Sequence, residues 1–330
     1  PVEVGVYLYG GNKVLMHPDG KYLFVLSSGL DVVDVSDPAN PVSVGGTGPS
    51  FPADITIVAD HAYLTSSEGY PASLWSVNIL DPLNLVVDGY FYFPENTSAS
   101  GVGIYGGYAY VADPNTGLHV VDISDPANMQ EVGYVDDVLF SPASVAISGP
   151  YCYLTTGLGG VRVMSLANRT APAEVGYYNP TSYTNGIDVV DNMVYVADSS
   201  TGLRVVDASN QLRPIEIGRL DPDPNVGVAV NVDVDGDYAY VTDGGLRVVD
   251  ISSPANPVDA SRVQLSYAIF ADKVTVAGDY AYFVGGNTVI GVADVSNPLA
   301  PTEVFYEYNI AVGLGVAVAE NILCVTTKWY

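Results

Sequence analysis

Residues 117–133 read GLHVVDISDPANMQEVG, and residues 29–45 read GLDVVDVSDPANPVSVG. This repeat motif, which we call the phrase, recurs in less similar form as GLRVVDASNQLRPIEIG at 202–218 and as GLRVVDISSPANPVDAS at 245–261. The residue that ends its GLxVVD part recurs at spacings of 44, 44, 43, 42, 43 and 44 residues, as Asp34, Asn78, Asp122, Ser165, Asp207, Asp250 and Asp294. A near-constant period of this length over seven units indicates a repeat architecture.

Each repeat contains four short runs with the composition of β-strands. In the third repeat they are GVGIYGG at 101–107, YAYVAD at 108–113, GLHVVDIS at 117–124 and QEVGYV at 130–135. Val, Ile and Tyr dominate these runs, and Gly, Pro, Asn and Asp separate them. No stretch predicts an amphipathic helix. Four strands in roughly 40–45 residues are typical of a propeller blade. The sequence therefore predicts an all-β chain that forms a single β-propeller domain over residues 1–330.

The strand sequences predict how blades of this kind would pack. The first strand of each repeat is rich in Ala, Gly, Ser and Val, which suits strands crowded around an axis. The second strand carries an aromatic side chain that is bulky enough to fill the space between blades, at Tyr63, Tyr110, Tyr153, Tyr195, Tyr240 and Tyr282. A β-solenoid is the competing architecture, but tight turns such as DGD at 235–237 favour antiparallel hairpins.

The acidic residues of the phrase are predicted to be structural. Asp37, Asp81 and Asp125 each precede a proline, a pairing typical of turns because the carboxylate accepts hydrogen bonds from backbone amides while proline presets φ. The position that ends GLxVVD holds Asp five times, Asn once and Ser once. All three side chains are short acceptors, so the position requires an acceptor rather than a charge.

The phrase GLxVVD[VI]SDPANPxxVG, with YAYVAD upstream, resembles the LVIVD repeat. The resemblance extends over nearly the whole chain and is strongest at 29–45, 117–133 and 245–257. It is weaker at 73–89 and 160–176. It implies a β-propeller in a secreted or surface protein of bacteria or archaea, and it supplies no catalytic residues.

The charge balance narrows the class of partner. The net charge is −26, from 37 acidic residues against only 11 Lys and Arg. This shortage of bases favours a secreted or cell-surface protein, with a halophilic surface as the alternative. The electrostatic field of a strongly negative protein repels nucleic-acid phosphates and anionic lipids, so no nucleic-acid partner is expected.

No apolar run approaches the roughly 18 residues of a membrane span, so no membrane insertion is expected. The two cysteines, Cys152 and Cys324, are predicted to be core residues.

One acidic segment suggests a metal. VDVDGD places Asp233, Asp235 and Asp237 at alternate positions, as in part of a calcium loop, although the complete EF-hand spacing is absent. Calcium, at acidic segments of this kind, is the only cofactor that the sequence suggests. The chain has neither HExxH, CxxC nor GxSxG. We therefore expect a non-enzymatic protein. The alternative is a hydrolase or lyase with an acidic or calcium-bearing site on the propeller axis, assembled from loop acids such as Asp54, Asp136, Asp137 and Asp272.

The connections between blades carry aromatic residues among polar ones. Aromatic side chains on the loops of a rigid scaffold often form binding surfaces. The predicted interaction surface consists of Phe91, Phe93, Phe140, Tyr178, Tyr183, Tyr267 and Phe270. The expected function is an interaction or assembly module that binds a protein or glycan partner.

The two ends of the chain read as parts of one further blade. PVEVG at 1–5 matches the end of the phrase, and 315–327 supplies a first and a second strand. This pattern favours eight blades, seven complete and one split between the termini, over seven. The split blade would lack its third strand, and its open edges invite a strand from another chain, which would build a filament. The predicted edge residues are Val2, Val4, Val6, Leu8, Ile322, Cys324 and Thr326.

Overall fold

The computed structural model describes most of the chain, namely residues 13–16, 21–26, 29–34, 42–50, 52–67, 71–136, 141–142, 144–180, 182–222, 227–263, 271–277, 279–285, 289–308, 312–319 and 322–328. Within these ranges every regular element is a β-strand except one 3-10 turn, η1 (Ser199–Thr201). None of the described elements is a helix long and apolar enough to cross a membrane. The chain divides into two compact units, an N-terminal unit of Val4–Tyr177 and a C-terminal unit of Tyr178–Tyr330 with Pro1–Glu3.

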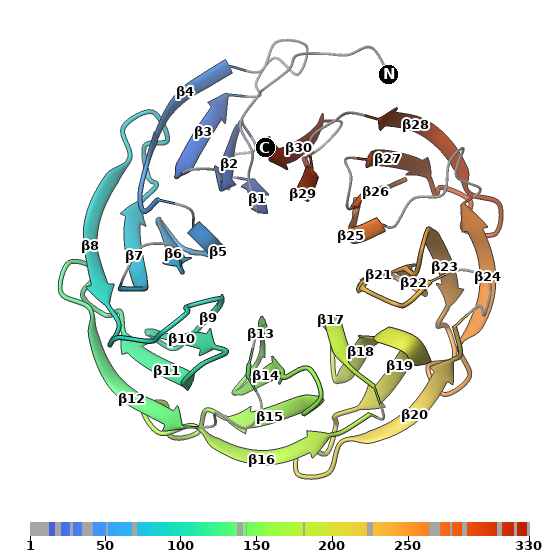
Figure 1. The fold of residues 1–330 in the computed structure, drawn as a ribbon, viewed down its shortest axis with the longest axis horizontal. Coiled ribbons are helices and arrows are strands. Elements are labelled where there is room, and N and C mark those ends of the chain that lie inside the picture. The colour runs from blue at the N-terminus through green and yellow to red at the C-terminus, as the bar shows by residue number, and fades with distance from the viewer. Residues whose placement is uncertain are drawn as a thin grey trace. The chain divides into compact units, whose positions relative to one another are not determined.

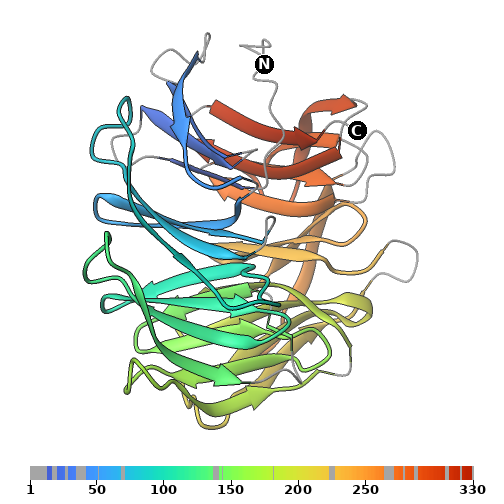
Figure 2. The same ribbon diagram turned by 60° about the vertical axis from the view of Figure 1, so that its left-hand side comes forward.

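The N-terminal unit holds four antiparallel sheets, each made of four consecutive strands (Figures 1 and 2). The first two sheets are β1 (Lys13–Met16), β2 (Tyr22–Leu26), β3 (Leu30–Asp34), β4 (Val42–Thr47) and β5 (Pro52–Val58), β6 (His61–Ser66), β7 (Ser73–Asn78), β8 (Val86–Tyr92). The next two are β9 (Gly101–Tyr105), β10 (Tyr108–Asp113), β11 (Gly117–Asp122), β12 (Gln130–Asp136) and β13 (Ser144–Ser148), β14 (Tyr151–Thr155), β15 (Val161–Ser165), β16 (Ala173–Tyr178).

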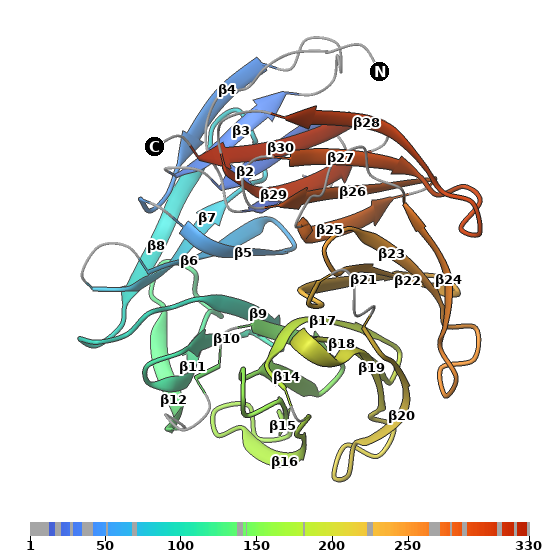
Figure 3. The ribbon, with the colours of Figure 1, turned by 45° about the vertical axis from the view of Figure 1, so that its right-hand side comes forward.

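The C-terminal unit repeats this plan three times and adds one pair of strands (Figure 3). Its first two sheets are β17 (Thr184–Val190), β18 (Met193–Asp198), β19 (Gly202–Asp207), β20 (Ile215–Leu220) and β21 (Asn231–Asp235), β22 (Tyr238–Thr242), β23 (Leu246–Asp250), β24 (Val258–Val263). The third sheet is β25 (Ala271–Ala277), β26 (Tyr280–Gly285), β27 (Val289–Asp294), β28 (Thr302–Tyr308), and the final pair is β29 (Val312–Ala319), β30 (Ile322–Lys328).

The seven complete repeats expected from the spacing are therefore seven four-stranded sheets, and β29 with β30 are the expected extra first and second strands. Within each unit the first strands of consecutive sheets lie next to each other, β5 beside β9 and β21 beside β25 (Figure 1). The pairing of residues 2–9, on which a split eighth blade depends, lies outside the described residues.

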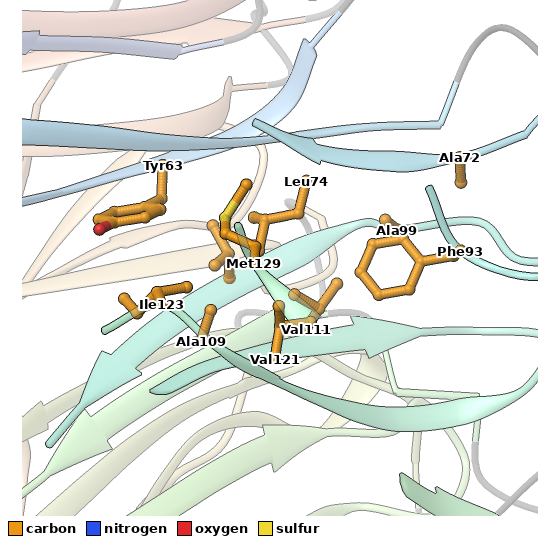
Figure 4. Close-up of a cluster of buried hydrophobic side chains, with 11 residues drawn as sticks. Tyr63, Ala72, Leu74, Phe93, Ala99, Ala109, Val111, Val121, Ile123 and Met129 are labelled. Carbon is orange, nitrogen blue, oxygen red and sulfur yellow. The ribbon is translucent and has the colours of Figure 1, made fainter. Parts of the chain in front are cut away.

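Within each unit hydrophobic clusters join consecutive four-stranded sheets, and the second-strand tyrosines Tyr63, Tyr110, Tyr195 and Tyr240 lie in them as predicted. Tyr63 of β6, 4% exposed, packs in one cluster with Val111, Val121 and Met129 of the next repeat (Figure 4). Four further tyrosines at this position are also buried, Tyr110, Tyr153, Tyr195 and Tyr240. Removing such large side chains from water is the main favourable term in the packing of one sheet on the next.

The acceptors of the repeated phrase close the turn between the third and fourth strands. Asp122 Oδ1 accepts a hydrogen bond from the amide of Ser124 at 2.9 Å. Asn78 and Ser165 accept from the amide two residues on in the same way, at 3.0 and 3.3 Å. Within the next turn, Asp125 Oδ1 accepts from the amide of Ala127 at 3.1 Å. The prediction that these side chains act as hydrogen-bond acceptors in turns is confirmed.

The glycine that ends the phrase has a separate role. A Cβ built on Gly133 of β12 would stand 1.8 Å from the carbonyl oxygen of Thr170, in the corresponding turn of the next repeat. On Gly218 it would stand 2.1 Å from the carbonyl oxygen of Pro254. Where this position holds Ser261 instead, its hydroxyl donates to the carbonyl oxygen of Pro298 at 2.5 Å. The turn of each of these repeats therefore docks on the fourth strand of the repeat before it.

Asp122→Ala should lower the free energy of unfolding by about 1 kcal/mol, because the amide of Ser124 loses its acceptor. Asp122→Asn is the control and should stay close to the wild type, since Asn78 makes the same bond. Urea denaturation of the three proteins measures the difference. Equal destabilisation by both substitutions would show that the charge, and not the acceptor, is required.

Gly133→Ala should lower the free energy of unfolding by about 3 kcal/mol or more, because the new methyl group overlaps backbone that cannot move without separating two sheets. The matched control is Gly45→Ala in β4, where no atom lies within 4 Å of the added Cβ. Urea midpoints are again the measurement. If both alanine variants unfold at the same urea concentration, the proposed docking contact is wrong.

Candidate functional site

Three tyrosines are exposed at one repeat position on the fourth strands of the N-terminal unit. In β8, β12 and β16 the glycine of the phrase is followed by tyrosine, in VDGYFY, EVGYVD and EVGYYN. These side chains, which we call the tyrosine row, are 53%, 44% and 56% exposed at Tyr90, Tyr134 and Tyr177. In β20 and β24 of the C-terminal unit the same position holds Arg219 and Arg262. Exposed tyrosines offer large, rigid contact areas with a polar tip, which is why they are frequent at interfaces.

Each ring of the tyrosine row contacts the side chain at the third position of GLxVVD on the neighbouring strand. The contacts are Trp75–Tyr90 and His119–Tyr134, with ring centroids 5.1 and 4.9 Å apart, and Arg162–Tyr177, with the guanidinium carbon 4.9 Å from the ring centroid. The hydroxyl of Tyr134 also donates to the carbonyl oxygen of Thr116. These contacts hold the rings in position before any partner binds, which lowers the entropy lost on binding.

The third position of GLxVVD also supports buried charge clusters. In the sheet β17–β20, Asp198 is fully buried and its Oδ2 lies 3.3 Å from Nε of Arg204. Arg204 Nη1 lies 3.2 Å from Glu216 Oε1, and Tyr178 donates its hydroxyl to Oε2 of the same carboxylate at 2.5 Å. Each charge thus has an opposite charge beside it. Removing one partner of such a buried set leaves an uncompensated charge, which is strongly destabilising.

The next sheet repeats this arrangement with an additional arginine. Arg262 binds both oxygens of Asp243 through Nη1 and Nη2, at 2.6 and 2.9 Å. Arg247 Nη2 donates to Asp259 Oδ2 at 2.9 Å. Burial raises the pKa of the Asp243 carboxyl, and the hydrogen bonds and charges of Arg262 and Arg247 oppose that rise. These groups hold three strands of one sheet together at one end.

Sequence reasoning missed these clusters, although their signal was present. The chain has few bases, and yet the third position of GLxVVD holds a base in four repeats, as His119, Arg162, Arg204 and Arg247. Their acidic partners on the fourth strand also recur, as Glu131, Glu174, Glu216 and Asp259. An alignment of the repeats, compared position by position, shows that a base at the third position of GLxVVD recurs together with an acid on the fourth strand.

One cluster has the chemistry of an activated nucleophile. Thr116 Oγ1 lies 2.8 Å from Nε2 of His119, whose Nδ1 lies 2.6 Å from Glu131 Oε1. A hydroxyl, an imidazole and a carboxylate in this order can form an alkoxide-like nucleophile. However, the amides of Asn115 and Thr116 are already bonded to Asp113 Oδ1, at 2.6 and 3.1 Å, and so do not form an oxyanion hole. Because arginine replaces the imidazole in three other repeats, we interpret His119 as a member of the buried charge clusters.

The predicted calcium residues lie at the end of β21 and the turn after it. Asp233 Oδ2 accepts a hydrogen bond from the amide of Val276 in β25 at 2.7 Å. Asp235 and Asp237 are exposed on either side of Gly236, which has a φ of +57°. Across the ranges that the structure describes, no three or more His, Cys, Asp or Glu side chains are grouped so that they could hold a metal ion. Calcium binding by these three residues stays a prediction.

Of the acids considered for a site on the axis, Asp54 instead ties the first strands of adjacent sheets, as does Asp188. Asp54 Oδ2 accepts from the amide of Val102 at 3.0 Å, and Asp188 Oδ2 from that of Val234 at 2.9 Å. Asn231 makes the same kind of contact with the amide of Val274 at 3.2 Å. Of the other acids considered, Asp136 is exposed at the end of β12, the side chain of Asp272 is not described, and Asp137 lies outside the described residues.

The predicted aromatic interaction surface is only partly confirmed as exposed. Phe93 is 2% exposed and packs on His119 at 5.0 Å between ring centroids, so its assignment to a surface is wrong. It points inward because it closes the cluster between two sheets. Phe91 and Tyr178 are half-buried, whereas Tyr183 is 52% exposed. Three further members lie outside the described residues, Phe140, Tyr267 and Phe270.

The predicted strand-exchange edges are described on one side only. Ile322, Cys324 and Thr326 lie on β30, which pairs with β29 in antiparallel register. The partner edge lies outside the described residues and comprises Val2, Val4, Val6 and Leu8. Insertion of a strand from another chain stays a prediction.

Asp233 should make the stability of the protein depend on pH. Burial raises the pKa of Asp233 to about 6, and the nearby carboxylates of Asp188 and Asp235 add to the rise. The folded state therefore binds this proton more tightly than the unfolded state, and its stability falls as the pH rises from about 4 to about 6.

Asp233→Asn removes this ionisation and can keep the bond to the amide of Val276, as Asn231 does with Val274. Relative to the wild type, the variant should gain about 2 kcal/mol between pH 4 and pH 7, because one pKa unit corresponds to about 1.4 kcal/mol. Urea denaturation at both pH values measures the gain. A difference between the two proteins that is the same at pH 4 and pH 7 would rule out this explanation.

Comparison with solved structures shows which fold these sheets form. The C-terminal WD40 domain of Sif2 is similar with a TM-score of 0.76 at 10% identity, over 98% of this chain and 94% of that one. The computationally designed Ika8 protein gives 0.75 at 10% identity, again over 98% and 94%. The WD40 repeats of RRP9 give 0.66 at 11% identity, over 98% and 96%. The chain has the β-propeller fold.

Comparison at the level of sequence identifies the repeat. No functionally curated protein matches the chain. A model of the LVIVD repeat matches residues 19–46, 97–137, 142–180, 182–221, 226–264 and 270–308. The matched segments include the fourth repeat, where the phrase is weak, but not the second repeat around 73–89. Because these segments make up more than half of the chain, the protein belongs to the LVIVD-repeat family.

Proposed function

We propose that this protein is a non-enzymatic interaction module on the cell surface or outside the cell, and that it binds a protein partner through the tyrosine row. The observation that carries the proposal is the recurrence of an exposed tyrosine at one position of three successive sheets, Tyr90, Tyr134 and Tyr177. Nothing in the fold requires these rings, since the same position holds glycine at Gly46 and arginine at Arg219. Exposed aromatic side chains that recur on one surface are typical of binding surfaces.

Two further observations support a protein partner. The similar solved structures include WD40 propellers, a fold that in general serves as a scaffold for protein interaction. The net charge of −26 favours association with basic or neutral partners, and it disfavours polyanions. The same charge balance, poor in bases rather than unusually rich in acids, supports a location outside the cell.

The test uses labelled protein and intact cells of the organism that makes it. Wild-type protein should bind the cells saturably, and the triple variant with alanine at Tyr90, Tyr134 and Tyr177 should bind at least about tenfold more weakly. Tyr183→Ala is the matched control, because it removes an equally exposed tyrosine outside the row. Added protease should also degrade the native protein on intact cells.

Three outcomes contradict the proposal: absence of saturable binding, equal binding by the triple variant, or full protection from protease on intact cells. Binding that survives protease treatment of the cells but is lost after periodate oxidation would show that the partner is a glycan rather than a protein.

A further inference from the structure

The second repeat departs from the others at the positions that form the tyrosine row. It lies outside the six segments that match the LVIVD repeat. At the third position of its GLxVVD equivalent it carries Trp75, where four later repeats carry a base. Its fourth strand adds a second exposed tyrosine, so that Trp75, Tyr90 and Tyr92 form one continuous aromatic cluster. A repeat that departs from its own pattern on the surface, while its core stays intact, points to a specific use of that surface.

The aromatic cluster is exposed and held in position. The ring of Tyr90 lies 5.1 Å from that of Trp75 and 5.1 Å from that of Tyr92, measured between centroids. Tyr90 and Tyr92 are 53% and 50% exposed. The indole N–H of Trp75 donates to Ser73 Oγ at 2.9 Å, which fixes the largest ring. The rings are tilted by 33° and 55° to one another, so they present faces in more than one direction rather than one flat wall.

The same unit shows what a tyrosine of this row binds when a cation is available. In the sheet β13–β16 the guanidinium of Arg162 lies over the ring of Tyr177, 4.9 Å from its centroid. A second pair in the unit, Arg169 over Tyr105, has a distance of 5.6 Å. In the second repeat the residue under Tyr90 is Trp75, whose indole supplies no charge. Tyr90 and Tyr92 therefore present ring faces that suit a cation–π contact. The second repeat has Trp75 at the position from which Arg162 supplies the guanidinium in the fourth repeat.

We infer that the aromatic cluster binds an arginine side chain of the protein partner, which supplies the missing guanidinium from outside. The inference rests on the proposed function and names the chemistry of the partner at this sheet. A guanidinium is planar and weakly hydrated, so it stacks on aromatic faces better than an ammonium does. The net charge of −26 attracts a basic segment to this surface.

The test measures binding of three short peptides that differ at one central residue, which is arginine, lysine or citrulline. Citrulline keeps the shape of arginine and lacks its charge. The arginine peptide should bind best, and the citrulline peptide should bind about tenfold more weakly or not at all. The double variant Tyr90→Ala with Tyr92→Ala should weaken binding of the arginine peptide about tenfold, whereas Phe at both positions should preserve it.

The control variant is again Tyr183→Ala, which should bind the arginine peptide like the wild type. Three results overturn the inference: no binding of the arginine peptide, equal binding of the citrulline peptide, or equal binding by the double alanine variant with a wild-type urea midpoint. The last result would show that the acidic chain attracts the peptide without this site. If the peptides fail while cell binding still depends on Tyr134 and Tyr177, the inference is wrong and the proposed function stands.

Discussion

The docking of one repeat's turn onto the preceding repeat's fourth strand is the contact on which the rest of the structure depends. At Gly133 and Gly218 the backbone of the next turn comes so close that no side chain fits. The turn itself must be compact, and Asp or Asn acceptors make it so by bonding the amides two residues on. At these sites the glycine and the turn of the next repeat are the two halves of one contact. The second-strand tyrosines Tyr63 and Tyr195 pack in the hydrophobic clusters between the same sheets or their neighbours.

The distribution of charge follows from the same repetition. Many of the acids have structural partners: some close turns, some accept amides between first strands, and some lie in the clusters around Arg204 and Arg247. The bases are few, and several are used inside these clusters. Much of the negative charge of this protein therefore comes from the short carboxylate acceptors that its repeats use. It also has a consequence for binding, since polyanions are repelled and basic segments are attracted.

Two facing positions of the repeat differ in residue type between repeats, and one of them carries the tyrosine row. The third position of GLxVVD lies opposite the residue that follows the phrase's glycine on the neighbouring strand, and this pair differs in residue type and size between repeats. In the C-terminal unit two sheets have arginine at both positions, Arg204 opposite Arg219 and Arg247 opposite Arg262. In three of the four sheets of the N-terminal unit the two residues form an aromatic or aromatic–cation pair, and the tyrosine ring of the pair is exposed. The residue types of this pair thus differ between repeats, while the strand pairing around it stays the same.

The sequence alone determined the repeat, its period, the four strands of each unit and the structural role of the turn acceptors, because these follow from local chemistry that recurs seven times. It also determined that the second-strand tyrosines are buried, since an aromatic residue recurs there in strands next to the small-residue first strands and fills the space between sheets. It did not determine which aromatic side chains reach the surface. Phe93 continues a strand and turns into the core, whereas Tyr90 and Tyr92, on the opposite face of that strand, turn outward. Likewise, VDVDGD has the spacing of a metal loop, but the partner of Asp233 is an amide 43 residues away. Burial and long-range partners depend on how sheets meet, and that is decided only when the tertiary structure forms.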